Sequence, residues 1–275
     1  METDPSTPSL LGIPRELRDQ INSYLTAHAI SRKPPPSPPF AGKRTRGADD
    51  IMYLADQLNT RFPNIALVNR QLWCEVTENV FSSTAKPSAE LDLMAKGYTF
   101  YPTFTHLPSH IRRGRGLDLK VNLRIFSTEA FRSNDGWPRQ AGAGFRTLLA
   151  LLNNFLRYGP PLVPSRHTVE DATPFSIDTL TVNVTFHDLY TPDTWARTSS
   201  EILKVLKGVA VSGVPSPFIK NVKADVNYEN RIGSLSVHKE WPVAEHRNAG
   251  SLYEWNRDGF WFLPRSSGSQ VLETE

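Results

Sequence analysis

The sequence predicts an α+β protein, in which an N-terminal three-helix unit precedes an irregular βαβαβ region with a short, mostly parallel sheet. Two observations lead to this fold class. Early in the chain, apolar residues recur at the three- and four-residue spacing of amphipathic helices. Later, three segments alternate apolar and polar residues, as half-buried strands do, and a helical pattern fills each gap between them. We therefore expect a helical unit over 10–82, an α/β domain over 95–263, and disordered ends over 1–9 and 266–275.

The first helix is expected from Pro14, because a proline at the first helical position loses no hydrogen bond. Four apolar residues then follow at i, i+4, i+7 and i+8, which places them on one stripe: Leu17, Ile21, Tyr24 and Leu25. Polar residues occupy the other faces: Arg15, Arg18, Asp19 and Asn22. The stripe either docks on a partner or packs inside the helical unit, and the sequence leaves both possibilities open.

Two further helices are expected within the helical unit. Asp49 and Asp50 are placed to cap the second helix, whose apolar face carries Ile51, Leu54, Ala55 and Leu58. Asn64 is placed to cap the third, whose stripe carries Ile65, Val68, Leu72, Val76 and Val80. Residues 31–48 lie between the first two helices and combine a proline run with five basic residues and no acidic one. Such a segment has little to bury, so this basic insertion is predicted to be disordered.

The α/β domain is predicted from strict alternation over 117–123, 180–186 and 222–228. Helices are expected between these strands, near 145–156 and near 198–209, where Thr198 and Glu201 are spaced as a capping box. An order of strand, helix and strand implies right-handed crossovers and a parallel sheet. Strands covered on both faces are continuously apolar, so the alternation predicts helices on one face and an open polar face. An edge strand is expected over 98–104 and a hairpin over 253–262.

The polar members of the three strands are expected to point away from the helices. Such a face either binds a protein partner or is an ordinary solvated surface, and we predict partner binding. The residues concerned are Asp118, Lys120, Asn122, Arg124, Thr181, Asn183, Thr185, Lys223, Asp225 and Asn227.

Composition narrows the function classes. The 275 residues carry a formal net charge of +3 and one cysteine, so no internal disulfide forms and an intracellular location, cytoplasm or nucleus, is expected. A basic loop on a near-neutral body does not predict nucleic-acid binding. No apolar run approaches the length of a membrane span. No metal-ligand spacing, phosphate loop or local catalytic motif stands out, so we expect no metal, no cofactor and no catalytic residue.

Two blocks of the helical unit resemble the F-box family. The first block is Leu10-Leu11-Gly12-Ile13-Pro14-Arg15-Glu16-Leu17 with Ile21 and Tyr24-Leu25, which is similar to that family's Leu-Pro-x-Glu-Leu opening. The second block is Ile65-Ala66-Leu67-Val68-Asn69-Arg70-Gln71-Leu72-Trp73, which is similar to the family's third helix. Both blocks are closest in detail to the F-box-like group of filamentous fungi, in which a variable α/β region follows the box.

The resemblance implies a subunit that docks on the Skp-type linker of an SCF-type cullin–RING ubiquitin ligase and recruits an unknown protein substrate. The residues that it places in linker docking are Leu10, Leu11, Ile13, Pro14, Glu16, Leu17, Ile21 and Leu25. Two other classes stay open: an interaction scaffold that is not linked to a ligase, and an enzyme with an unrecognised, non-local site. Linker binding distinguishes the adaptor from the scaffold, and an enzyme needs a concave pocket with perturbed acids or histidines.

Overall fold

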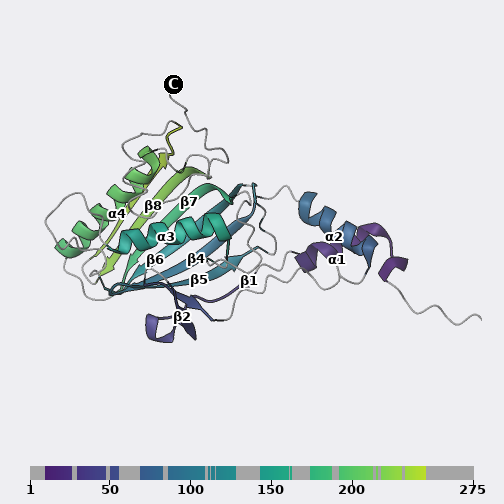
Figure 1. Cartoon of the computed structure of the whole chain (residues 1–275), viewed down its shortest axis with the longest axis horizontal. Coiled ribbons are helices and arrows are strands. Elements are labelled where there is room, and N and C mark those ends of the chain that lie inside the picture. The colour runs from purple at the N-terminus through teal and green to yellow at the C-terminus, as the bar shows by residue number, and fades with distance from the viewer. Residues whose placement is uncertain are drawn as a thin grey trace, which may run out of the picture.

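The computed structural model has an α+β architecture, as predicted. It describes residues 10–26, 30–47, 50–55, 69–82, 86–108, 111, 113–114, 116–127, 143–160, 162, 174–187, 192–212, 215, 218–230 and 233–245. These residues form a seven-stranded sheet, a two-stranded sheet, two helices over the large sheet, and a pair of helices beside it (Figure 1).

The large sheet has the strand order β1-β5-β4-β6-β7-β8-β9. Its four central strands, β4, β6, β7 and β8, run parallel, whereas β1–β5, β4–β5 and β8–β9 are antiparallel pairs. The predicted parallel strands are thus confirmed, but the sheet is larger and more mixed than the short, mostly parallel one expected. The bounds are Ile30–Ser31 for β1, Ser88–Lys96 for β4, Thr99–Leu107 for β5, Gly116–Ile125 for β6, Ser176–Phe186 for β7, Ile219–Asn230 for β8 and Gly233–Pro242 for β9.

Two helices connect the parallel strands and cover the same face of the sheet (Figure 1). They are α3 (Ala143–Tyr158) and α4 (Pro192–Ser212). Gly159 ends α3 with a φ of 74°, and its N–H donates to the carbonyl of Phe155 at 2.7 Å. The capping box predicted at Thr198 is wrong, because α4 begins at Pro192 and Thr198 is buried within the helix.

The core lies between these helices and the sheet. Alternate residues of β6, from Leu117 to Ile125, are buried beneath leucines and Phe155 of α3. The intervening residues of β6 point to the opposite face and keep partial exposure, Lys120 most of all. The predicted division into one covered apolar face and one open polar face is therefore what the strands adopt.

The large sheet includes residues before the expected domain boundary at residue 95, because β4 starts at Ser88 and the short β1 also belongs to it. Gly97, with a φ of 58°, makes the tight turn between the paired residues Lys96 and Thr99. A strand predicted over 98–104 is present as β5, but it is not the edge strand expected, because β1 pairs with its far end. Its Pro102 is tolerated because the N–H of Phe100, two residues earlier, points away from β4 to the carbonyl of Asp50 at 3.0 Å.

The basic insertion predicted to be disordered is ordered over residues 31–47. It contains a short 3-10 helix, Pro38–Phe40, and strand β2 (Arg44–Arg46), which pairs with β3 (Met52–Leu54). Arg44 donates to the carbonyl of Pro102 at 2.5 Å and to Oγ1 of Thr103 at 2.5 Å, both on β5. A basic side chain thus anchors the segment through partners that lie far away in the sequence. Because this side chain is largely buried, the pKa of Arg44 is lowered to about 10.

Within the part of the chain that the structure describes, the predicted three-helix unit does not appear. The second helix, expected to start at Ile51, is replaced by β3, and the structure instead has α1 (Arg15–Thr26) packed on α2 (Arg70–Ser82), with a 3-10 turn over Leu10–Gly12. We call α1 and α2 the hairpin; it lies to one side of the sheet and over neither face (Figure 1). The β-hairpin predicted over 253–262 lies outside the described part of the chain, as do the two ends predicted to be disordered, 1–9 and 266–275.

Candidate functional site

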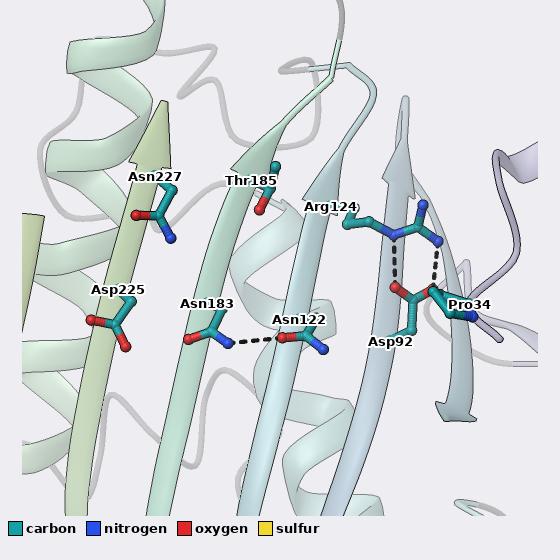
Figure 2. A pocket seen from close by; sticks show the side chains of 8 residues that line it. All are labelled: Pro34, Asp92, Asn122, Arg124, Asn183, Thr185, Asp225 and Asn227. Carbon is teal, nitrogen blue, oxygen red and sulfur yellow. Dashed lines mark hydrogen bonds and ion pairs between the residues drawn. The ribbon is translucent and has the colours of Figure 1, made fainter. Parts of the chain in front are cut away.

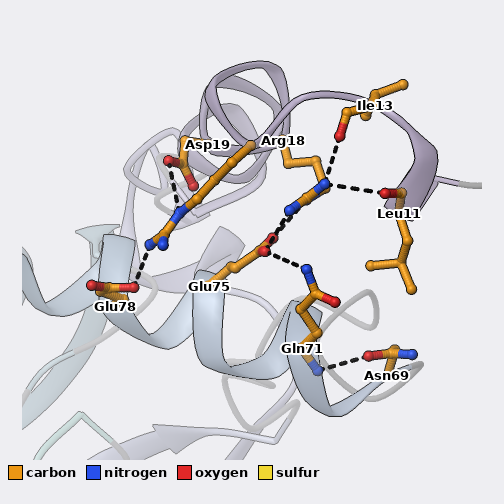
Figure 3. Close-up of polar contacts among 9 residues, drawn as sticks. Leu11, Ile13, Arg18, Asp19, Asn69, Gln71, Glu75 and Glu78 are labelled. Atoms are coloured by element: carbon orange, nitrogen blue, oxygen red, sulfur yellow. Dashed lines mark hydrogen bonds and ion pairs between the residues drawn. The ribbon is translucent and has the colours of Figure 1, made fainter.

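The hairpin is held together by a polar network (Figure 3). Arg18 of α1 donates from Nε to Oε2 of Glu75 at 2.8 Å and from Nη2 to Oε1 at 2.7 Å, a bidentate pair between two side chains that are each 7% exposed. Gln71, one turn before Glu75 on α2, donates to the same carboxylate at 3.0 Å. These hydrogen bonds, Arg18's above all, lower the pKa of Glu75 to about 2.

Arg18 also fixes the entry to α1. Its Nη1 donates to the carbonyl of Ile13 at 2.5 Å and to that of Leu11 at 3.3 Å, which ties the preceding turn to the helix (Figure 3). A second pair, Arg15 with Glu78 at 2.5 Å, lies on the exposed side of the hairpin. The sequence placed Arg18 on a face of α1 away from the apolar stripe, and the structure shows that this face is the buried one.

The apolar residues of α1 point outward instead. We call Leu17, Ile21 and Tyr24 the apolar stripe; their exposed fractions are 48%, 36% and 74%. On the same helix, Arg18 and Asn22 are buried. An ordinary surface helix turns its apolar stripe toward the core, so the hairpin has the reverse arrangement.

The structure places the other predicted docking residues at or near the start of α1. Leu10, Leu11 and Ile13 are half-buried, whereas Pro14 and Glu16 are exposed. Leu25 belongs to α1, but its side chain lies outside the described part of the structure. The second helix adds one exposed aromatic residue, Trp73, at 42%.

The open face of the sheet is the second candidate site, and its polar side chains form rows across the strands. Residues in register share a face, so three rows follow from the pairing. The first row is Glu90, Lys120, Thr181, Lys223 and Glu240; the second is Asp92, Asn122, Asn183, Asp225 and His238; the third is Arg124, Thr185, Asn227 and Ser236.

A hollow of about 520 Å³ lies over the second and third rows. Figure 2 shows polar side chains from β4, β6, β7 and β8 reaching toward it, with Pro34 at one end. Its lining is Pro34, Asp92, Asn122, Arg124, Asn183, Thr185, Asp225 and Asn227.

Arg124 closes one end of the hollow. Its guanidinium donates to both oxygens of Asp92 at 2.7 and 2.8 Å, and it also donates to the carbonyls of Pro35 and, at 3.4 Å, Pro36. The proline-rich segment therefore forms a wall at this end. Burial raises the pKa of Asp92, although Arg124 and Arg44 act in the opposite direction.

Carboxamides line much of the rest of the hollow, and His238 pairs with Asp225 at its border. Asn183 donates to Oδ1 of Asn122 at 2.8 Å, and Asn122 donates to Glu90 of the neighbouring row (Figure 2). On the outer strands, Nδ1 of His238 lies 2.5 Å from Oδ1 of Asp225. Ser236 donates to Asn227 at 2.8 Å.

All ten residues predicted for the partner-binding face belong to this sheet face or its edge. Asn122, Arg124, Asn183, Thr185, Asp225 and Asn227 line the hollow. Lys120, Thr181 and Lys223 lie in the adjacent row, and Asp118 lies beyond it, 2.7 Å from Lys86.

Sequence reasoning missed the strands on either side of these three. On β4, Glu90 and Asp92 alternate with Ala89, Leu91 and Leu93, and this signal was available. On β9, polar residues at 234, 236, 238 and 240 have the same period. The wall at Pro34 had no local signal, because its partner Arg124 lies far away in the sequence.

Comparison with models of known families, with curated proteins and with solved structures gave no match. Within the described residues, no group of three or more His, Cys, Asp or Glu is arranged to hold a metal ion. None of the helices described is both long enough and apolar enough to cross a membrane.

Proposed function

We propose that this protein is an interaction adaptor that docks on one partner through the hairpin and recognises a second protein through the open face of the sheet. The observation that carries the proposal is the outward apolar stripe of α1, beside the inward Arg18. Full burial of a leucine or isoleucine contributes about 1.5–3 kcal/mol, and the partial exposure of Leu17 and Ile21 forgoes roughly a third to a half of that for each side chain. A partner that covers the stripe recovers this free energy.

The resemblance of the first block to an F-box supports one partner in particular, the Skp-type linker of an SCF-type cullin–RING ubiquitin ligase. In this proposal the stripe docks in an apolar groove of the linker, in the manner of a helix whose anchors lie at i, i+4 and i+7. The half-buried Leu10, Leu11 and Ile13 extend the contact at the start of α1. The open sheet face then selects the substrate.

A second candidate is an interaction scaffold that is not linked to a ligase. The replacement of the expected middle helix by β3 favours it, because the F-box resemblance implies three helices. Both candidates use the same stripe, and they differ only in the identity of the partner.

Binding of a purified fungal Skp-type linker, measured by calorimetry, tests the proposal. Leu17→Ala removes a side chain that is desolvated on docking and should weaken binding about tenfold to hundredfold. Leu17→Asp should abolish it, because a charge then enters an apolar groove. The matched control is Gln20→Asp, which places the same charge at an exposed position of α1 and should change little.

Circular dichroism of each variant confirms that α1 remains helical. Folded wild-type protein with no measurable affinity for the linker would contradict the ligase adaptor and leave the scaffold. Equal effects of Leu17→Asp and Gln20→Asp would show that the stripe is not the docking surface.

A further inference from the structure

The charges of the open sheet face neutralise one another. Lys120 lies 3.4 Å from Glu90, Lys223 lies 3.0 Å from Glu240, and Arg124 pairs with Asp92. At the far end, Lys86 and Lys220 share Asp178. Among the residues that the structure describes, the basic groups of this face are thus engaged with acids. A ligand recognised mainly by its charge is therefore a poor fit to the hollow.

Carboxamides dominate what the hollow offers to a ligand. A primary amide has two N–H donors and an oxygen that accepts two hydrogen bonds. The contacts described above engage one N–H of Asn183 and the oxygen of Asn227. Both side chains therefore retain donor capacity toward the hollow. The peptide group also combines one N–H with one carbonyl, so it is the chemical complement of a side-chain carboxamide.

The chain already binds one of its own extended segments at the edge of the hollow. Arg124 donates to the carbonyls of two consecutive residues, Pro35 and Pro36. Pro34 then forms the end wall (Figure 2). Recognition here uses main-chain carbonyls, because a proline has no N–H to donate.

The spacing of the strands suits an extended chain that crosses them. Neighbouring strands are about 4.8 Å apart, so Asn122 on β6 and Asp225 on β8, in the same row, start from backbones about 9.6 Å apart. A polyproline II chain advances about 3.1 Å per residue, so residues three apart face the same way and lie about 9.3 Å apart. Asn183 on β7 lies between Asn122 and Asp225, so it would face the peptide groups of the bound chain that lie between those two positions.

We infer that the hollow binds the main chain of an extended, proline-containing peptide from a protein partner, held by the carboxamides of Asn122, Asn183 and Asn227. The peptide crosses β6, β7 and β8 beside the chain's own proline-rich wall. Specificity then comes from the extended backbone conformation rather than from a charged residue. This inference rests on the proposed function, since it names what the open face recognises.

Panning the full-length chain against a phage-displayed library of random twelve-residue peptides tests the inference. The expected peptides contain proline and share no charged position. Fluorescence polarisation with a selected peptide should show at least about tenfold weaker binding for Asn183→Leu and for Asn227→Leu. The matched control, Lys120→Ala, changes the adjacent row of the same face and should have less than a twofold effect.

Two further measurements separate main-chain recognition from other causes. Replacement of one peptide amide by an ester should weaken binding, because an ester lacks the N–H and has a weaker carbonyl acceptor. Thermal unfolding of each variant shows whether its sheet is intact, and Asn183→Ser provides a second, smaller substitution if the leucine variants unfold.

The inference is overturned if panning yields no peptide, if the asparagine variants bind as well as wild type, or if Lys120→Ala removes binding. It is also overturned if maltohexaose competes with the peptide, since the hollow would then be a polyol site. Linker affinity, measured on the same preparations, keeps this outcome separate from the proposed function. Wild-type protein that binds the linker but selects no peptide would contradict only the inference.

Discussion

The hairpin and the sheet distribute polar and apolar residues in opposite ways. The sheet buries Leu119, Val121 and Leu123 under α3 and α4 and turns its amides and charges to water. The hairpin buries Arg18 against Glu75 and turns Leu17 to water. The sheet therefore has its apolar side chains inside its own core, whereas the hairpin leaves part of its apolar side chains at the surface.

This difference separates the forces that hold the two regions together. Burial of apolar area stabilises the sheet and depends little on pH. In the hairpin, hydrogen bonds between charged groups add to the burial of Leu72 and Val76 on α2. Charge-dependent cohesion of this kind weakens when one partner loses its charge. We thus expect the hairpin and the sheet to respond differently to the same perturbation.

Truncation in the core of the sheet should have the largest effect on stability. Leu123 is fully buried in the centre of β6, so Leu123→Ala should lower the free energy of unfolding by about 2–5 kcal/mol. Chemical denaturation measures this change. Leu17→Ala removes the same atoms from the surface of the hairpin and should lower the free energy of unfolding much less. An equal loss of stability in the two variants would contradict the contrast between the hairpin and the sheet.

Removal of the central carboxylate should disrupt the hairpin and leave the sheet intact. Glu75→Ala removes the acceptor of two hydrogen bonds from Arg18, whose guanidinium then remains covered without its partner. Amide hydrogen exchange should accelerate throughout α2, while β6 to β8 stay protected. Glu78→Ala, which breaks only the exposed pair with Arg15, is the control and should have a much smaller effect. Equal acceleration in both variants would argue against a central role for Glu75.

Acid should weaken the hairpin before it weakens the part of the sheet around β4. The pKa of Glu75 is about 2 in the folded hairpin against an ordinary 4.5, so its contribution is complete above pH 4.5 and is lost as the pH falls toward 2. The pKa of Asp92 is raised by burial, so acid relieves a cost in the sheet instead. Hydrogen exchange between pH 6 and pH 3, corrected for the intrinsic rate, should show α2 losing protection before β4 does.

Glu75→Gln provides the control for this pH dependence. It keeps a side chain of similar shape but does not titrate, so α2 should lose its acid response. An unchanged response in the variant would assign the titration to another group.

The smallest expected effect on stability comes from substitution of the exposed aromatic residue of α1, Tyr24. Tyr24→Ser should change the free energy of unfolding by no more than about 0.5 kcal/mol, because the side chain is largely in water. Phe155→Ala, which truncates a buried ring of α3, should cost about 3–5 kcal/mol. Thermal and chemical denaturation of the two variants side by side sharpens the contrast between surface and core aromatic residues.

The parts of the fold that could be predicted are those in which the burial of each residue follows the local alternation of apolar and polar residues in the sequence. β6, β7 and β8 each have one face in the core and one in water, so strict alternation marks them. The same logic applies to Glu90 and Asp92 on β4, but there the alternation is shorter, because the apolar Met94 takes the next position of the polar face. The candidate sheet face was thus predictable in its centre and less so at its edges.

Long-range partners explain the predictions that were wrong. The segment around Arg44 has no apolar pattern, yet carbonyls and a hydroxyl on distant strands give it order. The spacing of Ile51 and Leu54 fits a helix, but Ile51 bridges to Phe100 and the next residues pair with β2. For α1, periodicity identified the stripe correctly, but it could not show that Glu75 would draw Arg18 inward.

The central claim is that the hairpin presents its apolar stripe to a partner while the sheet keeps its own core. Hydrogen–deuterium exchange of the full-length chain, with and without a purified Skp-type linker, tests it most directly. The account predicts that the linker slows exchange over residues 10–24 and in α2, and leaves β6, β7 and β8 unchanged. Slower exchange confined to the sheet, or no change anywhere at saturating linker, would contradict it.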